Sequence, residues 1–131
     1  MPNATGTFEI AFGKEDGYHE TEDGVKLTRA SGIQRFTGDI EGDGWVEWLM
    51  CYLPDGSARF VGLQRIEGSV DGRAGGFVME AVGAHDGERS TARWSIVAGS
   101  GTEALVDIRG DGSFDAPGGP HATYSLEYRL A

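Results

Sequence analysis

The sequence predicts an all-β protein: a closed antiparallel barrel of about eight strands, joined mostly by hairpins as a meander. Glycine makes up 22 of the 131 residues, and seven glycines directly follow an aspartate. Asp-Gly suits a type I′ hairpin turn, because both central residues of that turn need a positive φ. The segments between these pairs are rich in β-branched and aromatic residues, and none has a sustained helical period. The pairs are Asp16-Gly17, Asp23-Gly24, Asp43-Gly44, Asp55-Gly56, Asp71-Gly72, Asp86-Gly87 and Asp111-Gly112.

Eight strands are expected between and around these turns. In chain order they cover residues 4–13, 25–38, 45–53, 58–69, 74–84, 89–98, 104–115 (where the strand is broken) and 121–130. Apolar residues alternate along the first strand at Phe8, Ile10 and Phe12, and along the sixth at Trp94 and Ile96. The last strand alternates in the same way, at Tyr124, Leu126, Tyr128 and Leu130. The middle strands are delimited mainly by the Asp-Gly pairs beside them.

These strands are expected to close on themselves. A meander leaves two free edges, and closing the sheet into a barrel removes them. A sandwich of two sheets is the alternative arrangement. The length is typical of one domain, so we expect residues 1–131 to form a single barrel domain. Residues 15–23 carry five acidic side chains without EF-hand spacing, and we expect them to form a solvated loop over one end of the barrel.

Composition and charge argue against several classes of function. The net charge of −10 is unsuited to non-specific binding of nucleic acid or of an anionic membrane, since both need a basic surface. No apolar run is long enough to span a membrane, and residues 1–10 lack the features of a signal peptide, so we expect the chain in the cytoplasm. Cys51 is the single cysteine and the three histidines lie far apart in the sequence. We therefore expect no metal site and, since no cofactor-binding motif occurs, no cofactor.

The turns also predict which side chains face one another. A two-residue turn at Asp55-Gly56 pairs Glu47 with Gln64. At the next hairpin, a plain two-residue turn pairs Gln64 with Met79, whereas a turn with one bulge residue pairs Gln64 with Glu80. We favour the bulged register, which makes Glu47, Gln64 and Glu80 a polar row across three neighbouring strands.

This polar row lies in an apolar face and is therefore a candidate site. A buried carboxylate is costly unless it is hydrogen-bonded or protonated, so two carboxylates beside a glutamine would be poised for acid-base chemistry near neutral pH. Glu47 and Glu80 are the candidate catalytic residues. The candidate ligand-binding residues are Trp45, Leu49, Cys51, Phe60, Gln64, Val82 and Trp94.

The alternative is that this face is the solvent side of the barrel. The three polar residues are then ordinary exposed side chains, and Trp48, Met50 and Tyr52 on the opposite face fill the barrel. Both faces are apolar, so one of them is expected to meet a partner subunit. A homo-oligomer follows from either choice.

Five segments together resemble a known family over nearly the whole chain, the bacterial "domain of unknown function 3224" family. They are Leu27-Thr28-Arg29-Ala30, Phe36-Thr37-Gly38-Asp39-Ile40-Glu41-Gly42, Phe60-Val61-Gly62-Leu63-Gln64-Arg65, Gly99-Ser100-Gly101-Thr102 and Arg109-Gly110-Asp111-Gly112. The resemblance implies a small closed barrel similar to that of the allene oxide cyclases. The last two segments also resemble the Gly-Thr-Gly…Arg-Gly turn of those enzymes and of dirigent proteins, with Glu103 where a third glycine is usual.

One departure from the family pattern bears on the register. Family members often carry Glu at the position of Gln64 and Gln at the position of Glu80, and this chain has them exchanged. Two side chains that face each other permit such an exchange, and this is why the bulged register is favoured.

Two functions follow as hypotheses. Barrels of about eight strands have room for one small ligand, so the first is binding of a small lipophilic molecule inside the barrel. The related enzymes imply that a cofactor-free isomerase or cyclase activity could accompany it, and whether the chain is an enzyme stays open. The second is a non-catalytic oligomeric scaffold or interaction protein whose barrel is plugged by its own side chains.

Overall fold

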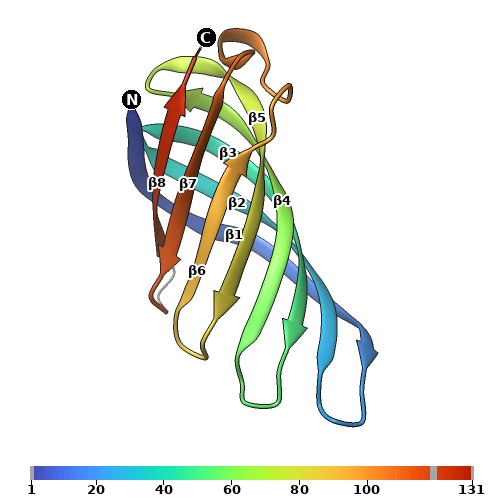
Figure 1. Cartoon of the computed structure of the whole chain (residues 1–131). Coiled ribbons are helices and arrows are strands. Elements are labelled where there is room, and N and C mark those ends of the chain that lie inside the picture. Colours follow the sequence, from blue (N-terminus) through green and yellow to red (C-terminus); the bar gives the residue numbers. More distant parts are fainter. Residues whose placement is uncertain (1, 119–120, 131) are drawn as a thin grey trace.

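The computed structural model describes residues 2–118 and 121–130, apart from the side chain of Phe12. Eight strands form a closed barrel in which each strand pairs with the next and β8 pairs with β1, every pair antiparallel (Figure 1). This confirms the predicted fold class over the sandwich. The strands are β1 (Asn3–Glu20), β2 (Lys26–Gly38), β3 (Ile40–Tyr52), β4 (Ala58–Val70), β5 (Arg73–His85), β6 (Ser90–Ile96), β7 (Arg109–Ala116) and β8 (His121–Arg129). Among the described residues, none forms a helix long and apolar enough to cross a membrane.

Four of the seven Asp-Gly pairs lie in the turns between strands, and three lie within β1, β3 and β7. Asp71 and Gly72 make a two-residue turn with φ of 48° and 82°, as a type I′ hairpin requires. Gly112 is one of the strand glycines, and a Cβ there would lie 2.3 Å from the carbonyl oxygen of Ser125. Its lack of a side chain therefore serves close strand packing rather than a turn.

Two predicted elements were wrong in extent. Residues 15–20 are not a loop, because β1 continues to Glu20 and pairs with β2 as far as Lys26. The broken strand expected at 104–115 is a short 3-10 turn, η1 (Glu103–Leu105), followed by β7.

The segment 97–108 between β6 and β7 closes one end of the barrel. Its Leu105 and Ile108 are buried. The pairing of β5 with β6 ends at Met79, and this segment bonds to the edge of β5 beyond that point. The backbone N–H of Thr102 donates to the carbonyl of Gly76 (2.9 Å), and the N–H of Gly76 donates to Thr102 Oγ1 (2.9 Å). The loop thus satisfies backbone groups that the sheet leaves free.

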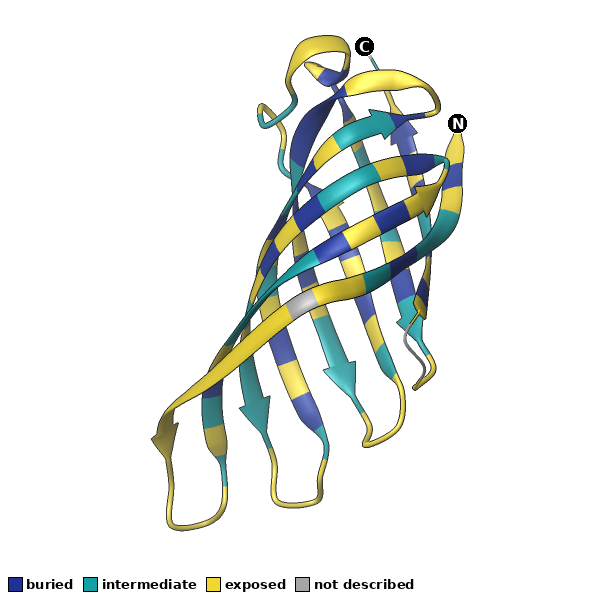
Figure 2. Ribbon diagram, turned by 180° about the vertical axis from the view of Figure 1, so that it is seen from behind, coloured by how far each residue is buried: buried dark blue, intermediate teal, exposed yellow. Residues whose placement is uncertain are grey.

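Aromatic side chains fill the interior. Trp94 is 1% exposed, and its ring lies 5.7 to 6.2 Å, centroid to centroid, from those of Phe8, Phe36, Phe114 and Tyr124. Buried and exposed residues alternate along the strands (Figure 2), as expected for a barrel whose inner face is the core. Trp48 and Met50 pack against this core, as the alternative orientation of the sheet predicted.

The register between β3 and β4 differs by one residue from the prediction. The N–H of Leu53 donates to the carbonyl of Ser57 (2.8 Å), so the hairpin loop has three residues, Pro54, Asp55 and Gly56, with Gly56 at a φ of 89°. Glu47 consequently faces Leu63. A slip of one residue moves every side chain to the other face of the sheet, so this small error decides the position of the site.

The favoured bulged register between β4 and β5 was also wrong. Gln64 pairs with Met79, as the plain two-residue turn predicted, and with Val46 on its other side. Gln64 is fully buried, whereas Glu47 and Glu80 lie on the outer face with Leu63 between them. The polar row of Glu47, Gln64 and Glu80 therefore does not exist.

Candidate functional site

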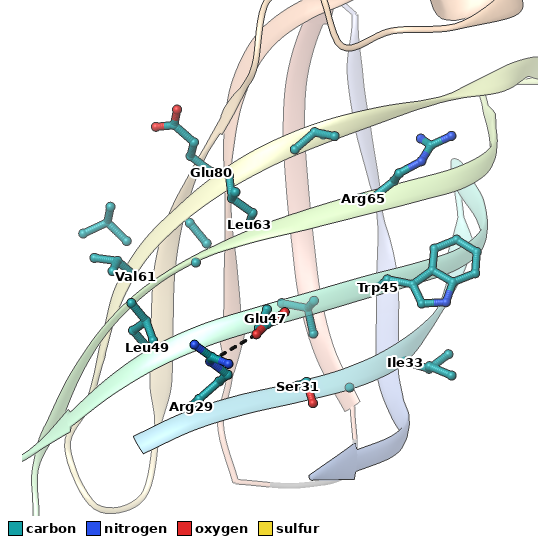
Figure 3. A pocket seen from close by; sticks show the side chains of 16 residues that line it. Arg29, Ser31, Ile33, Trp45, Glu47, Leu49, Val61, Leu63, Arg65 and Glu80 are labelled. Carbon is teal, nitrogen blue, oxygen red and sulfur yellow. Dashed lines mark ion pairs between the residues drawn. The ribbon is translucent and has the colours of Figure 1, made fainter. Parts of the chain in front are cut away.

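A groove of about 1060 Å³ runs over the outer face of β2, β3, β4 and β5 (Figure 3). Most of the side chains that line it point away from the barrel axis. Its apolar floor consists of Trp45, Leu49, Val61, Leu63 and Val82, each between 46% and 55% exposed. An exposed apolar surface of this kind, on a chain with a net charge of −10, is typical of a groove that binds a ligand or another protein.

Four charged side chains also line the groove. Arg29 Nε lies 3.3 Å from Glu47 Oε1, and both side chains are mostly exposed. Arg65 pairs with Glu67, which lies two residues along the same strand (2.5 Å). Glu80 is the fourth. Two arginines and two glutamates leave the groove formally neutral, in contrast to the acidic chain as a whole.

The structure brings five of the nine predicted site residues into this groove, on the outside of the barrel. They are Trp45, Glu47, Leu49, Glu80 and Val82. Cys51 and Phe60 line a smaller adjoining hollow of about 370 Å³, which shares Leu49, Val61 and Val82 with the groove. Gln64 and Trp94 do not take part, because both are buried inside the barrel.

Sequence reasoning missed Val61, Leu63, Arg29 and Arg65 as groove residues. The predicted register, which is off by one residue, places Val61, Leu63 and Arg65 on the face opposite to that of Glu47. The signal that could have placed them is Pro54, because a proline before Asp-Gly suits the type I turn of a three-residue hairpin loop rather than a type I′ turn. A three-residue loop gives the observed pairing of Leu63 with Glu47.

Inside the barrel, two glutamine side chains form a hydrogen-bonded pair. Gln64 Nε2 donates to Gln34 Oε1 (2.7 Å), and both side chains are fully buried. Gly44 on the intervening strand β3 pairs with Gln34, and a Cβ there would be 3.1 Å from Gln34 Oε1. The small residue on the strand between them leaves room for the two amides to meet.

A second polar group lies at the end of the barrel where β1 extends past β8. Thr28 Oγ1 and the hydroxyl of Tyr52 both donate to Glu15 Oε2, at 2.6 and 2.5 Å. Burial, the hydrogen bond to Glu15 and the charge of that carboxylate raise the pKa of Tyr52 to about 12. The phenol therefore stays protonated near neutral pH and acts as a hydrogen-bond donor, not as a nucleophile.

Tyr124 is likewise a structural residue. Its hydroxyl accepts a hydrogen bond from the N–H of Ile40 (2.9 Å) and donates to the carbonyl of Thr37 (2.9 Å), which ties β8 to the turn between β2 and β3. Burial raises its pKa to about 12. Within the described parts of the chain, no three His, Cys, Asp or Glu side chains gather as a metal site would require.

Comparisons with known proteins agree with the barrel and leave the activity open. The family model described as "Protein of unknown function (DUF3224)" matches residues 4–128. The chain is similar to the crystal structure of a protein with unknown function from the DUF3224 family of Shewanella oneidensis MR-1, with 23% identity and a TM-score of 0.79. That match covers 100% of this chain and 98% of the other. No curated protein is significantly similar.

Proposed function

Since the chain belongs to the DUF3224 family, for which no activity is established, we propose its function from the groove: it binds a small lipophilic molecule on the outer face of β2 to β5. The observation that carries this proposal is the contiguous apolar floor of Trp45, Leu49, Val61, Leu63 and Val82. Small-molecule sites typically measure roughly 300–1,000 Å³ and are lined mainly by apolar side chains with a few polar groups. The groove, at about 1060 Å³, lies at the upper end of that size range and has that composition.

The outer groove replaces the lumen as the proposed site. The aromatic cluster around Trp94 occupies the interior, and a ligand there would have to displace well-packed rings. In the outer groove, by contrast, the apolar side chains are already exposed, and covering them with a ligand is favourable by about 25 cal/mol per Å².

Binding, rather than catalysis, is the part of the hypothesis that the geometry favours. The Glu47 carboxylate is exposed and paired with Arg29, so it lacks the burial by which an acid or base is usually tuned. An isomerase or cyclase activity would require the ligand itself to cover Glu47 or Glu80. The proposed role of the two arginines and two glutamates is to orient a polar end of the ligand.

Titration with a fluorescent fatty acid tests the proposal. Leu63→Glu places a charge in the middle of the apolar floor, and Val106→Glu is its matched control, because Leu63 and Val106 are 55% and 56% exposed and Val106 lies outside the groove. We expect saturable binding by the wild type and by Val106→Glu, and loss of binding in Leu63→Glu. Undiminished binding in Leu63→Glu would point to the lumen, and no saturable binding by the wild type would overturn the proposal.

A non-catalytic oligomeric scaffold is the second candidate. The filled interior favours this role, because the barrel's own side chains occupy the space in which a substrate would react. In this case the exposed floor of the groove would serve contact with another protein surface.

A further inference from the structure

We propose that a second copy of this chain covers the groove when no ligand occupies it, in a two-fold symmetric dimer whose barrels cross. The dimer is inferred from the groove surface alone, and only the competition between dimer and ligand rests on the proposed ligand binding. Three properties of the groove identify a second copy as the partner: its apolar area, its charge and its shape.

The apolar area matches what a stable dimer needs. The five floor residues are each about half exposed. Aromatic side chains cover roughly 150–250 Å² each, and with that range as an upper bound for Leu and Val, the exposed fractions amount to at most on the order of 500 Å². A standard interface buries about 800 Å² per partner, of which about 56–65% is non-polar, or roughly 450–520 Å². One groove per copy thus supplies the apolar part of such an interface.

The charge of the groove fits a copy of itself better than a strongly charged partner. Two chains with a net charge of −10 repel each other over most of their surfaces. The groove lining has two positive and two negative side chains, so this is a neutral face on which two copies can meet. In a two-fold interface the same patch faces itself, so the arginines of one copy can lie against the glutamates of the other.

The shape also permits self-packing. A twisted barrel is a hyperboloid, whose outer waist is concave along the axis and convex around it. Two such saddles fit together when one is turned by about 90°, the angle of orthogonal sheet packing. The groove crosses four adjacent strands of the wall of the closed barrel (Figure 3).

The second copy and a lipophilic ligand would compete, because both cover the same side chains. Dimer formation uses two free grooves, so ligand at ten times its dissociation constant would raise the apparent dissociation constant of the dimer about 100-fold. Ligand binding would therefore release monomers.

Sedimentation velocity tests this inference over roughly 1 to 200 µM protein, the range of weak dimers. We expect the wild type and Val106→Glu to shift from monomer to dimer as the concentration rises. Leu63→Glu and a second groove variant, Val61→Glu, should stay monomeric, with a dissociation constant raised roughly 100-fold or more, since each substitution occurs twice in the interface. Far-UV circular dichroism confirms that each variant folds.

The outcomes separate the dimer from ligand binding. A wild type that is monomeric throughout, or a Leu63→Glu variant that dimerises like the wild type, overturns the dimer. Were that wild type still to bind the fluorescent fatty acid in a Leu63-dependent way, the proposed function would stand without the dimer. Dimerisation that depends on Leu63, with no fatty-acid binding by any variant, would support the dimer and overturn the proposed function. A dimer that binds fatty acid and stays intact at saturation contradicts the competition.

Discussion

Replacing Trp94 with alanine should destabilise the protein strongly, because Trp94 is the centre of the aromatic cluster that fills the barrel. The indole is 1% exposed and lies against Phe8, Phe36, Phe114 and Tyr124. Substitutions of buried Phe or Trp by Ala cost about 3–5 kcal/mol, and the closed wall of strands limits how far this site can collapse, so we expect about 4 kcal/mol. That is a large part of the 5–15 kcal/mol by which a typical domain is stable.

Urea unfolding followed by far-UV circular dichroism measures this loss without relying on tryptophan fluorescence. Trp45→Ala is the matched control, since the same residue type is removed from the outer groove, where it is 49% exposed. We expect that control to cost less than about 1 kcal/mol. Equal and small losses for the two variants would mean that Trp94 does not fill the lumen, and the argument for an outer site would then fail. The cavity left by Trp94→Ala should also admit an apolar ligand that the wild-type lumen excludes.

Two further predictions concern the glycines and the tyrosines. Gly68→Ala should destabilise the protein by about 2 kcal/mol or more, because the added Cβ would lie 1.9 Å from the carbonyl oxygen of Glu41. Gly13→Ala, whose Cβ would lie 3.5 Å from the nearest atom, should be neutral or stabilising by up to about 1 kcal/mol. Urea unfolding of both variants checks this prediction, and equal effects on the free energy of unfolding would refute it. Tyr52 and Tyr124 should ionise in the folded protein at about pH 12, above the ordinary phenol pKa of 10.0, as followed by ultraviolet absorbance. Because their folded pKa values are raised, their contribution to stability is complete below pH 10 and is lost as the pH rises towards 12; unchanged stability across that window would contradict the assignment.

The fold was predictable because local signals agreed with one another. Asp71-Gly72 has the positive φ angles of a type I′ turn, and the predicted alternation holds along β6 and β8, where Trp94 and Ile96, and Tyr124 and Leu126, are buried on one face. Consistent turn chemistry and a period of two along the strands suffice to predict an antiparallel meander.

The extent of β1 was not predictable from these signals. Its last third is rich in charged residues, and Asp16-Gly17 resembles a turn, yet the strand continues to Glu20. Pairing with β2 holds it, together with the hydrogen bonds of Glu15 to Thr28 and Tyr52. Such support comes from a neighbouring strand and is absent from the local sequence.

The sequence grouped five residues that do share the outer groove, but it placed them on the inner face of the barrel wall. Glu47, Glu80 and Leu49 line the same groove, but Leu63 and not Gln64 lies between the two glutamates. One extra residue in the Pro54-Asp55-Gly56 loop reverses the faces of β4 relative to β3, and with them the partners of Glu47. Which side chains of β4 face the core and which face the groove thus depended on the length of a single turn.

Methyl-resolved NMR during a fatty-acid titration tests most directly whether the outer groove, and not the lumen, binds the ligand. Val82 faces the groove and Met79, three residues earlier on the same strand, is fully buried in the core, so the two methyl-bearing residues report on opposite sides of one strand. Ligand in the groove predicts saturable shifts at Val82, Val61 and Leu63, with Met79 and Leu126 little changed. The reverse pattern, with shifts at Met79 and Leu126 and none at Leu63, would contradict it.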